Sequence, residues 1–294
     1  MVHGARSELI GHLPAREKAR RTTIIRSPSL SNVSVVADLV ELAYYRDLIY
    51  TLTMHRIKVR YKQSLLGVSW AIIQPLSMTV IFAAVFSLIV RMPSDGAPYL
   101  LFAYVALLPW NCFSASVSNA TGGLVSNSQL VTKVYFPREI LPATYILAAL
   151  FDFIIGVSVL GVLLIWYRVP LGINAAYALP VMLILVMFSM AIALFASATQ
   201  VRFRDIGLAI PLLLQIWMFA TPVVYPMSVV PSRLCSLYVL NPMAGIIENF
   251  RRVILLGSPP DTASLYVSAA VSVSLLIASY IYFKRVEATM ADVI

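Results

Sequence analysis

The sequence predicts an all-α membrane protein in which six transmembrane helices follow an amphipathic interfacial helix. Of its 294 residues, 60% are apolar and only 12% are charged, and the mean hydropathy is +0.85. Soluble domains carry about 25% charged residues, so this composition indicates a protein that resides in a lipid bilayer. Several uncharged runs are also long enough to cross a bilayer, which takes about 20 helical residues.

Six apolar runs are predicted to span the membrane: Val68–Val90, Ala97–Asn119, Ile140–Tyr167, Ala175–Gln200, Ile206–Pro226 and Ala263–Phe283. Between the last two, residues 227–262 form an external segment whose apolar part predicts short interfacial or re-entrant helices. With a cytoplasmic N-terminus, 17 Lys and Arg lie inside and 5 outside. The positive-inside rule therefore predicts that both termini are cytoplasmic, mainly because residues 1–67 carry 11 of these charges.

The chain before the first span divides into two parts, and residues 68–294 form the predicted six-helix transmembrane domain. Residues 1–33 are predicted to be a flexible cytoplasmic segment, because they contain no apolar run or helical stripe. Residues 34–67 combine an amphipathic helix, whose apolar residues recur at helical spacing from Leu39 to Leu52, with a basic motif. Such a helix lies in the membrane interface, although an ordinary packed surface helix remains the alternative.

The basic motif opens the stretch RIKVRYKQSLLGVSWAIIQPL, which runs from Arg56 to Leu76. Basic segments occur in nucleic-acid-binding proteins, but one placed before a multi-span body is typical of contact with anionic membrane lipids. We therefore expect membrane lipids, and no nucleic acid, among the partners.

The sequence offers no catalytic motif. It contains no phosphate-binding P-loop, no Rossmann glycine fingerprint, and neither HExxH nor GxSxG. Cys112 and Cys235 belong to no metal-ligand pattern. Asp152 is the clear acid within a span, and one acid does not make a proton or sodium relay. We expect no catalytic residue, no metal and no cofactor in this chain, which therefore lacks an energy source of its own.

Four blocks of the sequence, over about residues 60–252, occur in an order that is typical of one family. The first is RYKQSLLGVSWAIIQPL, with Arg60, Tyr61, Lys62, Ser64, Leu66, Gly67, Trp70 and Pro75 in matching places. The second runs from Leu107 to Pro142. The others are FRDI before the fifth predicted span and TPVVYP followed by LNPMAGIIENFR. Together they resemble the type-2 ABC export permeases of the polysaccharide class, which include O-antigen, capsule and teichoic-acid exporters.

This resemblance implies a type-2 ABC exporter fold and a half-transporter. A homodimer would form one pore, and two separate ATP-binding cassette subunits would hold ATP and Mg. The implied substrate is a polysaccharide on a polyprenyl-pyrophosphate lipid, exported across a bacterial cytoplasmic (inner) membrane. A permease of the same fold for drugs or small lipids is the first alternative. A membrane enzyme or scaffold of glycan assembly is the second.

The resemblance places substrate access at the first block. Arg56, Lys58, Arg60 and Lys62 are candidates to bind the pyrophosphate, because basic side chains form charge-assisted hydrogen bonds with phosphate oxygens. The alternative is that they are topology anchors on anionic lipid. In the same motif as Tyr61, we expect Gly67 to end the interfacial helix or to allow a sharp turn, and Pro75 to kink the span. We expect Trp70 to anchor at the interface, and a platform for a sugar ring is the alternative.

Three further groups complete the candidate site. The coupling helix that docks on the ATPase is predicted in Ser126–Arg138, where an ordinary loop is the alternative, with contacts from Asn127, Lys133, Phe136, Pro137, Arg138 and Glu139. Aromatic residues that either line the pore for sugar stacking or simply pack are Phe102, Tyr104, Trp110 and Phe113. Arg251 and Arg252 either form an external gate or rest on lipid headgroups. Asp152 is expected to join helices rather than to contact substrate.

Overall fold

The computed structural model describes residues 44–62, 64–94, 96–231, 233 and 235–293. These residues form helices and connecting turns, and none of them forms a strand. The predicted flexible segment 1–33 and the first part of the predicted interfacial helix lie outside the described residues. The described part of that helix is α2 (Arg46–Lys62), which continues through the whole basic stretch.

The remaining elements follow α2 along the chain. They are η1 (Gly67–Ser69), α3 (Trp70–Ala83), η2 (Ala84–Ile89), α4 (Tyr99–Thr121), α5 (Gly123–Ser126), α6 (Ser128–Lys133), α7 (Ile140–Trp166), η3 (Ile173–Tyr177), α8 (Ala178–Arg202), α9 (Ile206–Phe219), η4 (Met227–Val229), α10 (Cys235–Leu240), α11 (Pro242–Leu255) and α12 (Thr262–Val293).

Five described helical segments are long and apolar enough to cross a membrane: Gly67–Ser87, Tyr99–Thr121, Ile140–Trp166, Ile173–Arg202 and Thr262–Ala288. They coincide with the predicted first, second, third, fourth and sixth spans. The all-α membrane fold is therefore confirmed, because each of these runs is apolar over a full bilayer thickness.

The fifth predicted span is shorter than expected. Helix α9 ends at Phe219 after 14 residues, which corresponds to a length of about 21 Å. A turn over residues 220–225 then leads away from the helix axis. Pro222 lies in this turn and has no N–H to donate to a helical carbonyl. The apolar run therefore reaches Pro226 in sequence, whereas the helix does not.

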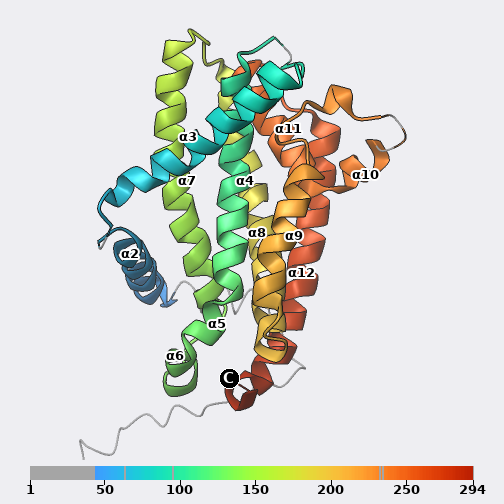
Figure 1. Ribbon diagram of the computed structural model, residues 1–294. Coiled ribbons are helices and arrows are strands. Elements are labelled where there is room, and N and C mark those ends of the chain that lie inside the picture. The colour runs from blue at the N-terminus through green and yellow to red at the C-terminus, as the bar shows by residue number, and fades with distance from the viewer. Residues whose placement is uncertain (1–43, 63, 95, 232, 234, 294) are drawn as a thin grey trace, which may run out of the picture. The chain divides into compact units, whose positions relative to one another are not determined.

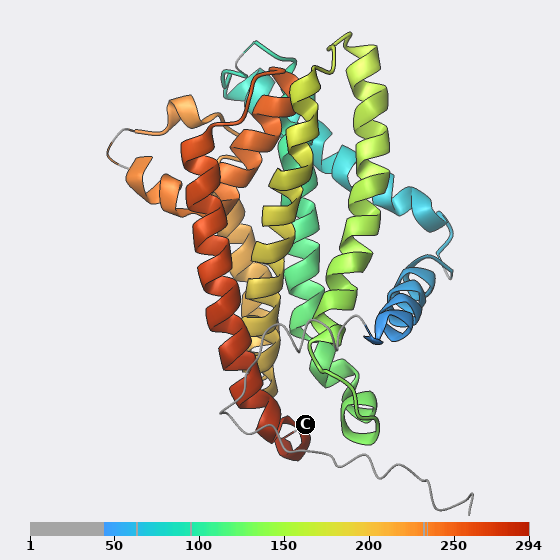
Figure 2. The ribbon, with the colours of Figure 1, turned by 180° about the vertical axis from the view of Figure 1, so that it is seen from behind.

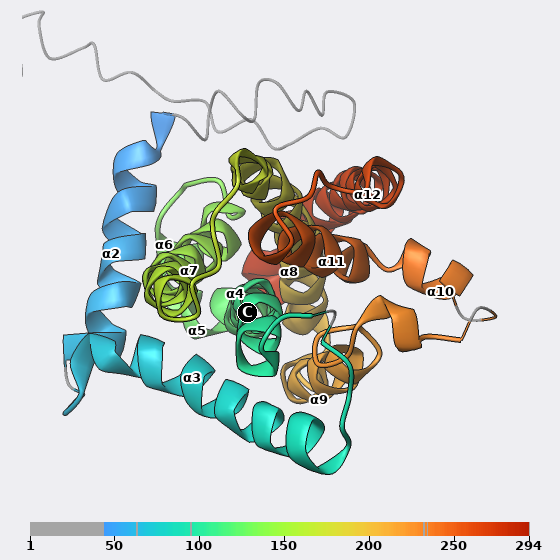
Figure 3. The same ribbon diagram turned by 90° about the horizontal axis from the view of Figure 1, so that it is seen from above.

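Helix α4 lies at the centre of the bundle, whereas α3 lies at its edge (Figure 3). In the most apolar part of α4, 78% of the residues are buried. In the most apolar part of the span Gly67–Ser87, which contains α3, only 11% of the residues are buried. The views agree that α2 and α3 run along the outside of α7 and α4, with α8, α11 and α12 on the far side of α4. The closest packing within the bundle joins α8 to α12 and α4 to α7.

Gly156 allows the close approach of α4 and α7. A Cβ at this position would overlap Cδ2 of Leu108 on α4. On the same side of α7, the hydroxyl of Tyr104 donates to the carbonyl of Gly156 over 3.0 Å. A glycine here therefore brings the two helix backbones close enough for a side chain to bond directly to the neighbouring backbone.

Helices occupy the predicted external segment, and one of them is buried in protein. Helix α11 packs against α4, α8 and α12, and most of its side chains are buried. Asn241 caps its N-terminus by accepting a hydrogen bond from the Met243 N–H over 3.1 Å, and Pro242 occupies the first turn. Backbone within a bilayer must be helical or buried in protein so that its polar groups are hydrogen-bonded, and α11 meets both conditions.

The loops alternate between two ends of the bundle. Helices α5 and α6, the turn between α8 and α9, and the C-terminal part of α12 lie together at the lower end in Figure 1. The connections from α7 to α8 and from α11 to α12 lie at the opposite end, as Figure 2 shows from behind. This alternation matches the predicted order of inside and outside loops.

Candidate functional site

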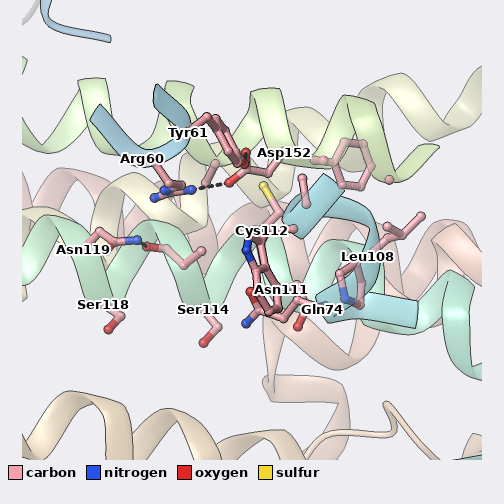
Figure 4. Close-up of a pocket in the computed structure, with 17 residues that line it drawn as sticks. Arg60, Tyr61, Gln74, Leu108, Asn111, Cys112, Ser114, Ser118, Asn119 and Asp152 are labelled. Atoms are coloured by element: carbon pink, nitrogen blue, oxygen red, sulfur yellow. Dashed lines mark hydrogen bonds and ion pairs between the residues drawn. The ribbon is translucent and has the colours of Figure 1, made fainter. Parts of the chain in front are cut away.

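A cavity of about 540 Å³ lies between α2, α3, α4 and α7. Residues from all four helices line it: Arg60 and Tyr61 from α2, Trp70, Gln74 and Pro75 from α3, Asn111, Ser114, Ser118 and Asn119 from α4, and Asp152 and Gly156 from α7. Figure 4 shows most of these residues. The cavity therefore opens where the basic motif meets the first three spans.

Asp152 joins α7 to the end of α2 at one wall of the cavity. Nη1 of Arg60 forms an ion pair with Oδ2 of Asp152, and the hydroxyl of Tyr61 donates to Oδ1 (Figure 4). Burial and this hydrogen bond raise the pKa of Tyr61 to about 12, so the phenol keeps its proton and acts as the donor. The expected helix-joining role of Asp152 is thus confirmed.

Arg56 makes a second contact between α2 and α7, outside the cavity lining. Its Nε donates to the Thr144 hydroxyl over 2.8 Å, and its guanidinium lies 3.4 Å from the ring centroid of Tyr145. Lys58 and Lys62 are exposed and also lie outside the lining. Of the four basic residues predicted to bind pyrophosphate, Arg60 is therefore the one that the cavity includes.

Gly67, Trp70 and Pro75 lie between the end of α2 and the second turn of α3. Gly67 has φ +51°, a left-handed conformation that costs glycine little. Trp70, half exposed, begins α3 and lines the cavity, and Pro75 lines it from the second turn of the helix. The hydroxyl of Thr79 donates to the Pro75 carbonyl over 2.8 Å.

One face of α4 presents uncharged polar side chains to the cavity. Asn111, Ser114 and Ser118 recur at spacings of three and four, so they lie along a single helical stripe, and Asn119 lies beside it. Figure 4 shows Asn111, Ser114 and Ser118 directed to the same side of the helix. The sequence analysis did not select these residues. Their spacing within an uncharged span was the available signal.

The aromatic residues predicted as a pore lining lie elsewhere. Phe102, Tyr104, Trp110 and Phe113 are all buried within the chain, and none lines the cavity. The ring of Phe113 stacks on Phe188 of α8 at 5.2 Å between centroids. Phe102 and Phe113 lie on the face of α4 opposite Asn111, whereas Tyr104 lies on the same side as Asn111 and bonds to Gly156 of α7. In this structure the four rings line no open passage.

Arg251 is buried rather than exposed at an external gate. Its side chain is 4% exposed, and its Nη2 donates to the carbonyls of Pro222 and Val223 over 3.2 and 3.0 Å. Its guanidinium also lies 3.7 Å from the ring centroid of Phe102. Arg251 therefore holds the turn after α9 in place. Arg252 is exposed, and its Nε donates to the Pro259 carbonyl over 2.8 Å.

The predicted coupling segment has a buried base and an exposed tip. Phe136, Pro137 and Glu139 are buried. Nζ of Lys284 on α12 lies 2.9 Å from Oε1 of Glu139 and 3.1 Å from Oε2 of Glu287. Burial raises the pKa of Glu139, and the Lys284 charge opposes this. These contacts attach the start of α7 to α12.

Two other predicted coupling residues also bond within the chain. The backbone N–H of Arg138 donates to Oε1 of Glu287 over 3.3 Å. Nδ2 of Asn127, between α5 and α6, donates to the Gly123 carbonyl over 2.7 Å. The exposed tip consists of Lys133, Val134 and Tyr135. Of these three residues, only Lys133 is among the predicted contacts, because a residue's exposure in a loop has no sequence signal.

Comparison with known proteins places the chain in a family. The profile of the ABC-2 type transporter family matches residues 47–255. The O-antigen export system permease protein RfbA of Myxococcus xanthus is 32% identical over 250 residues, covering 84% of this chain and 95% of the relative. A protein of the same name from Klebsiella pneumoniae is 27% identical over 218 residues, covering 74% and 83%. The polysialic acid transport protein KpsM of Escherichia coli is 24% identical over 250 residues, covering 82% and 94%. The chain therefore belongs to the ABC-2 type transporter membrane family.

Proposed function

We propose that this chain is the membrane-embedded half of an ATP-driven exporter of lipid-linked polysaccharide. Its family is a family of transporter permeases, and its relatives are named for O-antigen export and polysialic acid transport. Two copies form the pore in the cytoplasmic membrane of a bacterium, with both termini in the cytoplasm. Two separate ATPase subunits bind ATP and Mg. The names of the relatives favour this function over export of drugs or small lipids.

The observation that carries the proposal is the cavity between the basic end of α2 and the spans. Arg60 offers a planar fork of donors that suits phosphate oxygens. Asp152 occupies that fork through its carboxylate. A diphosphate has more charge and more acceptor oxygens than one carboxylate, so it competes for Arg60 on favourable terms. Asp152 thus acts as a resident counter-ion that the substrate headgroup displaces.

Two surfaces support the proposed partners. The tip at Lys133–Tyr135 is exposed at the end of the bundle that holds the C-terminal part of α12, and it is the contact for the ATPase. Helix α9 exposes apolar side chains, among them Leu208, Leu212 and Ile216. An apolar helix face beside the bundle suits either lipid or the second copy. In the homodimer it borders the shared pore.

The direct test uses bacterial cells that lack this chain. Lipid-linked glycan is extracted, and its side of the inner membrane is determined by treating intact and opened spheroplasts with a glycosidase. We expect the glycan to accumulate on the cytoplasmic side and to be absent from the cell surface. Unchanged surface glycan would contradict export of polysaccharide and favour a small substrate. A glycan that is never made would instead indicate a role in assembly.

A further inference from the structure

The polar stripe of α4 has unused hydrogen-bonding capacity. Within the described part of the chain, the side chains of Asn111, Ser114 and Ser118 make no hydrogen bond, and neither does the amide of Gln74 across the cavity on α3. Asn119, at the end of the stripe, donates to the Ala115 carbonyl of its own helix over 2.7 Å. Two amides and two hydroxyls therefore face the same cavity without a protein partner.

Such groups are unfavourable against hydrocarbon. An amide or hydroxyl that leaves water without gaining a hydrogen bond loses free energy, and polar side chains in spans face protein, water or substrate for this reason. The opposite face of the same helix carries Phe102 and Phe113, which are fully buried among the neighbouring helices. The orientation of α4 thus directs the polar side chains to a space that a polar occupant fills.

We infer that the stripe Asn111–Ser114–Ser118 of α4, with Gln74 of α3, binds sugar hydroxyls of the exported glycan next to its diphosphate. This inference rests on the proposed function and adds the side chains that hold the carbohydrate. Side-chain amides and hydroxyls both donate and accept, which matches the hydroxyls of a sugar. The stripe carries no charge, which suits neutral sugars rather than phosphate.

The position of the stripe relative to Arg60 supports this assignment. Arg60, Asp152 and the stripe line one cavity of about 540 Å³, a volume within the usual range for ligand sites. In a glycan linked to a lipid diphosphate, the first sugar is bonded to the phosphate. A diphosphate at Arg60 therefore brings the first sugars within reach of α4. Packing of a second copy of the chain against the stripe would instead require a flat or protruding surface, whereas the stripe lines a cavity.

Photo-crosslinking identifies what occupies the stripe. A diazirine-bearing amino acid replaces Ser118 in the full chain, in cells that also make the transporter's other subunits and are fed a tritiated hexose. The control carries it at Val162, an exposed residue of α7 that lies outside the cavity lining. We expect labelled glycan attached at position 118 and not at position 162. A cross-link to a second copy, or to phospholipid alone, would overturn the inference.

Substitutions measure how much the stripe contributes. Because each lost hydrogen bond lowers binding modestly, we expect Asn111→Ala with Ser118→Ala to reduce export about three- to tenfold at unchanged chain abundance. Ser158→Ala is the matched control, since Ser158 is an exposed residue of α7 outside the cavity lining. Unchanged export by the double variant would contradict the inference. If the double variant exports normally but surface glycan is still lost in cells that lack the chain, this inference fails and the proposed export function stands. Failure of the inference is therefore distinguishable from failure of the proposed function.

Discussion

Asp152 forms an ion pair with Arg60 and accepts a hydrogen bond from Tyr61, both of α2. Removing the charge of Arg60 or of Asp152 therefore has a structural as well as a functional effect. Arg60→Ala leaves an unpaired carboxylate in a span. Because Arg60 and Asp152 are 38% and 24% exposed, we expect a loss of about 1–3 kcal/mol, less than for a fully buried pair. Asp152→Asn should cost less, since the amide still accepts from Tyr61.

The double variant Arg60→Ala with Asp152→Asn separates structure from substrate binding. We expect it to recover the membrane abundance and detergent melting temperature that Arg60→Ala loses, because no charge is left unpaired. Export should stay low, since the fork that we propose to bind the phosphates is gone. Export restored to the native rate in the double variant would mean that the pair is purely structural.

Arg60 and Asp152 are each predicted from the sequence as notable residues, but their ion pair is not. Each stood out by its charge beside or within an apolar run, which is a local signal. Their pairing depends on how α2 lies against α7, which no local pattern encodes. The same reason explains Arg251, whose position near Arg252 suggested an exposed gate. Its burial depends on a turn about 29 residues earlier in the chain, whose carbonyls it binds.

Among the helices, the contact of α4 with α7 gives a matched pair of substitutions. Gly161→Ala lies on α7 with no atom within 4 Å of the new Cβ, so the helix gains up to about 1 kcal/mol from propensity. Gly156→Ala has the same propensity gain but must displace Leu108 in a packed interior, at about 1–3 kcal/mol. We expect the Gly156 variant to melt at a lower temperature than the Gly161 variant. Equal melting temperatures of the two variants would contradict this prediction, because they would mean that α4 and α7 move apart to accept the new Cβ without a loss of stability.

Most transmembrane helices were predictable, because a long run of apolar residues is visible in the sequence itself. Any uncharged run of sufficient length becomes a helix in a bilayer, whatever its neighbours are. Helix α9 shows the limit of this argument. Residues 206–226 are uncharged throughout, but the helix stops at Phe219, where distant residues supply partners for the turn. The orientation of α4 was also not predicted, although Asn111, Ser114 and Ser118 recur at helical spacing, because this spacing alone does not tell whether that face borders a cavity or another helix.

Assembly with the ATPase gives a prediction for the exposed tip. Tyr135 is 67% exposed and makes no ring contact in the described part of the chain. We expect Tyr135→Ala to weaken co-purification of the ATPase and to lower export, with little change in the melting temperature of the permease alone. Tyr177→Ala is the control, since Tyr177 is 47% exposed at the opposite end of the bundle. Equal co-purification of the ATPase with both variants would place the docking surface elsewhere.

The loose attachment of α3 has a consequence for the energy of export. Transferring hydrocarbon into water costs about 0.8 kcal/mol for each CH₂ group, so a long isoprenoid tail cannot pass through an aqueous tunnel cheaply. Only 11% of the residues in the most apolar part of the first span are buried within the chain, and residues of this span line the cavity. In the proposed exporter, a lipid tail that moves along this exposed side stays in the bilayer throughout. The work supplied by ATP would then move only the diphosphate and the sugars, and it would not grow with the length of the lipid.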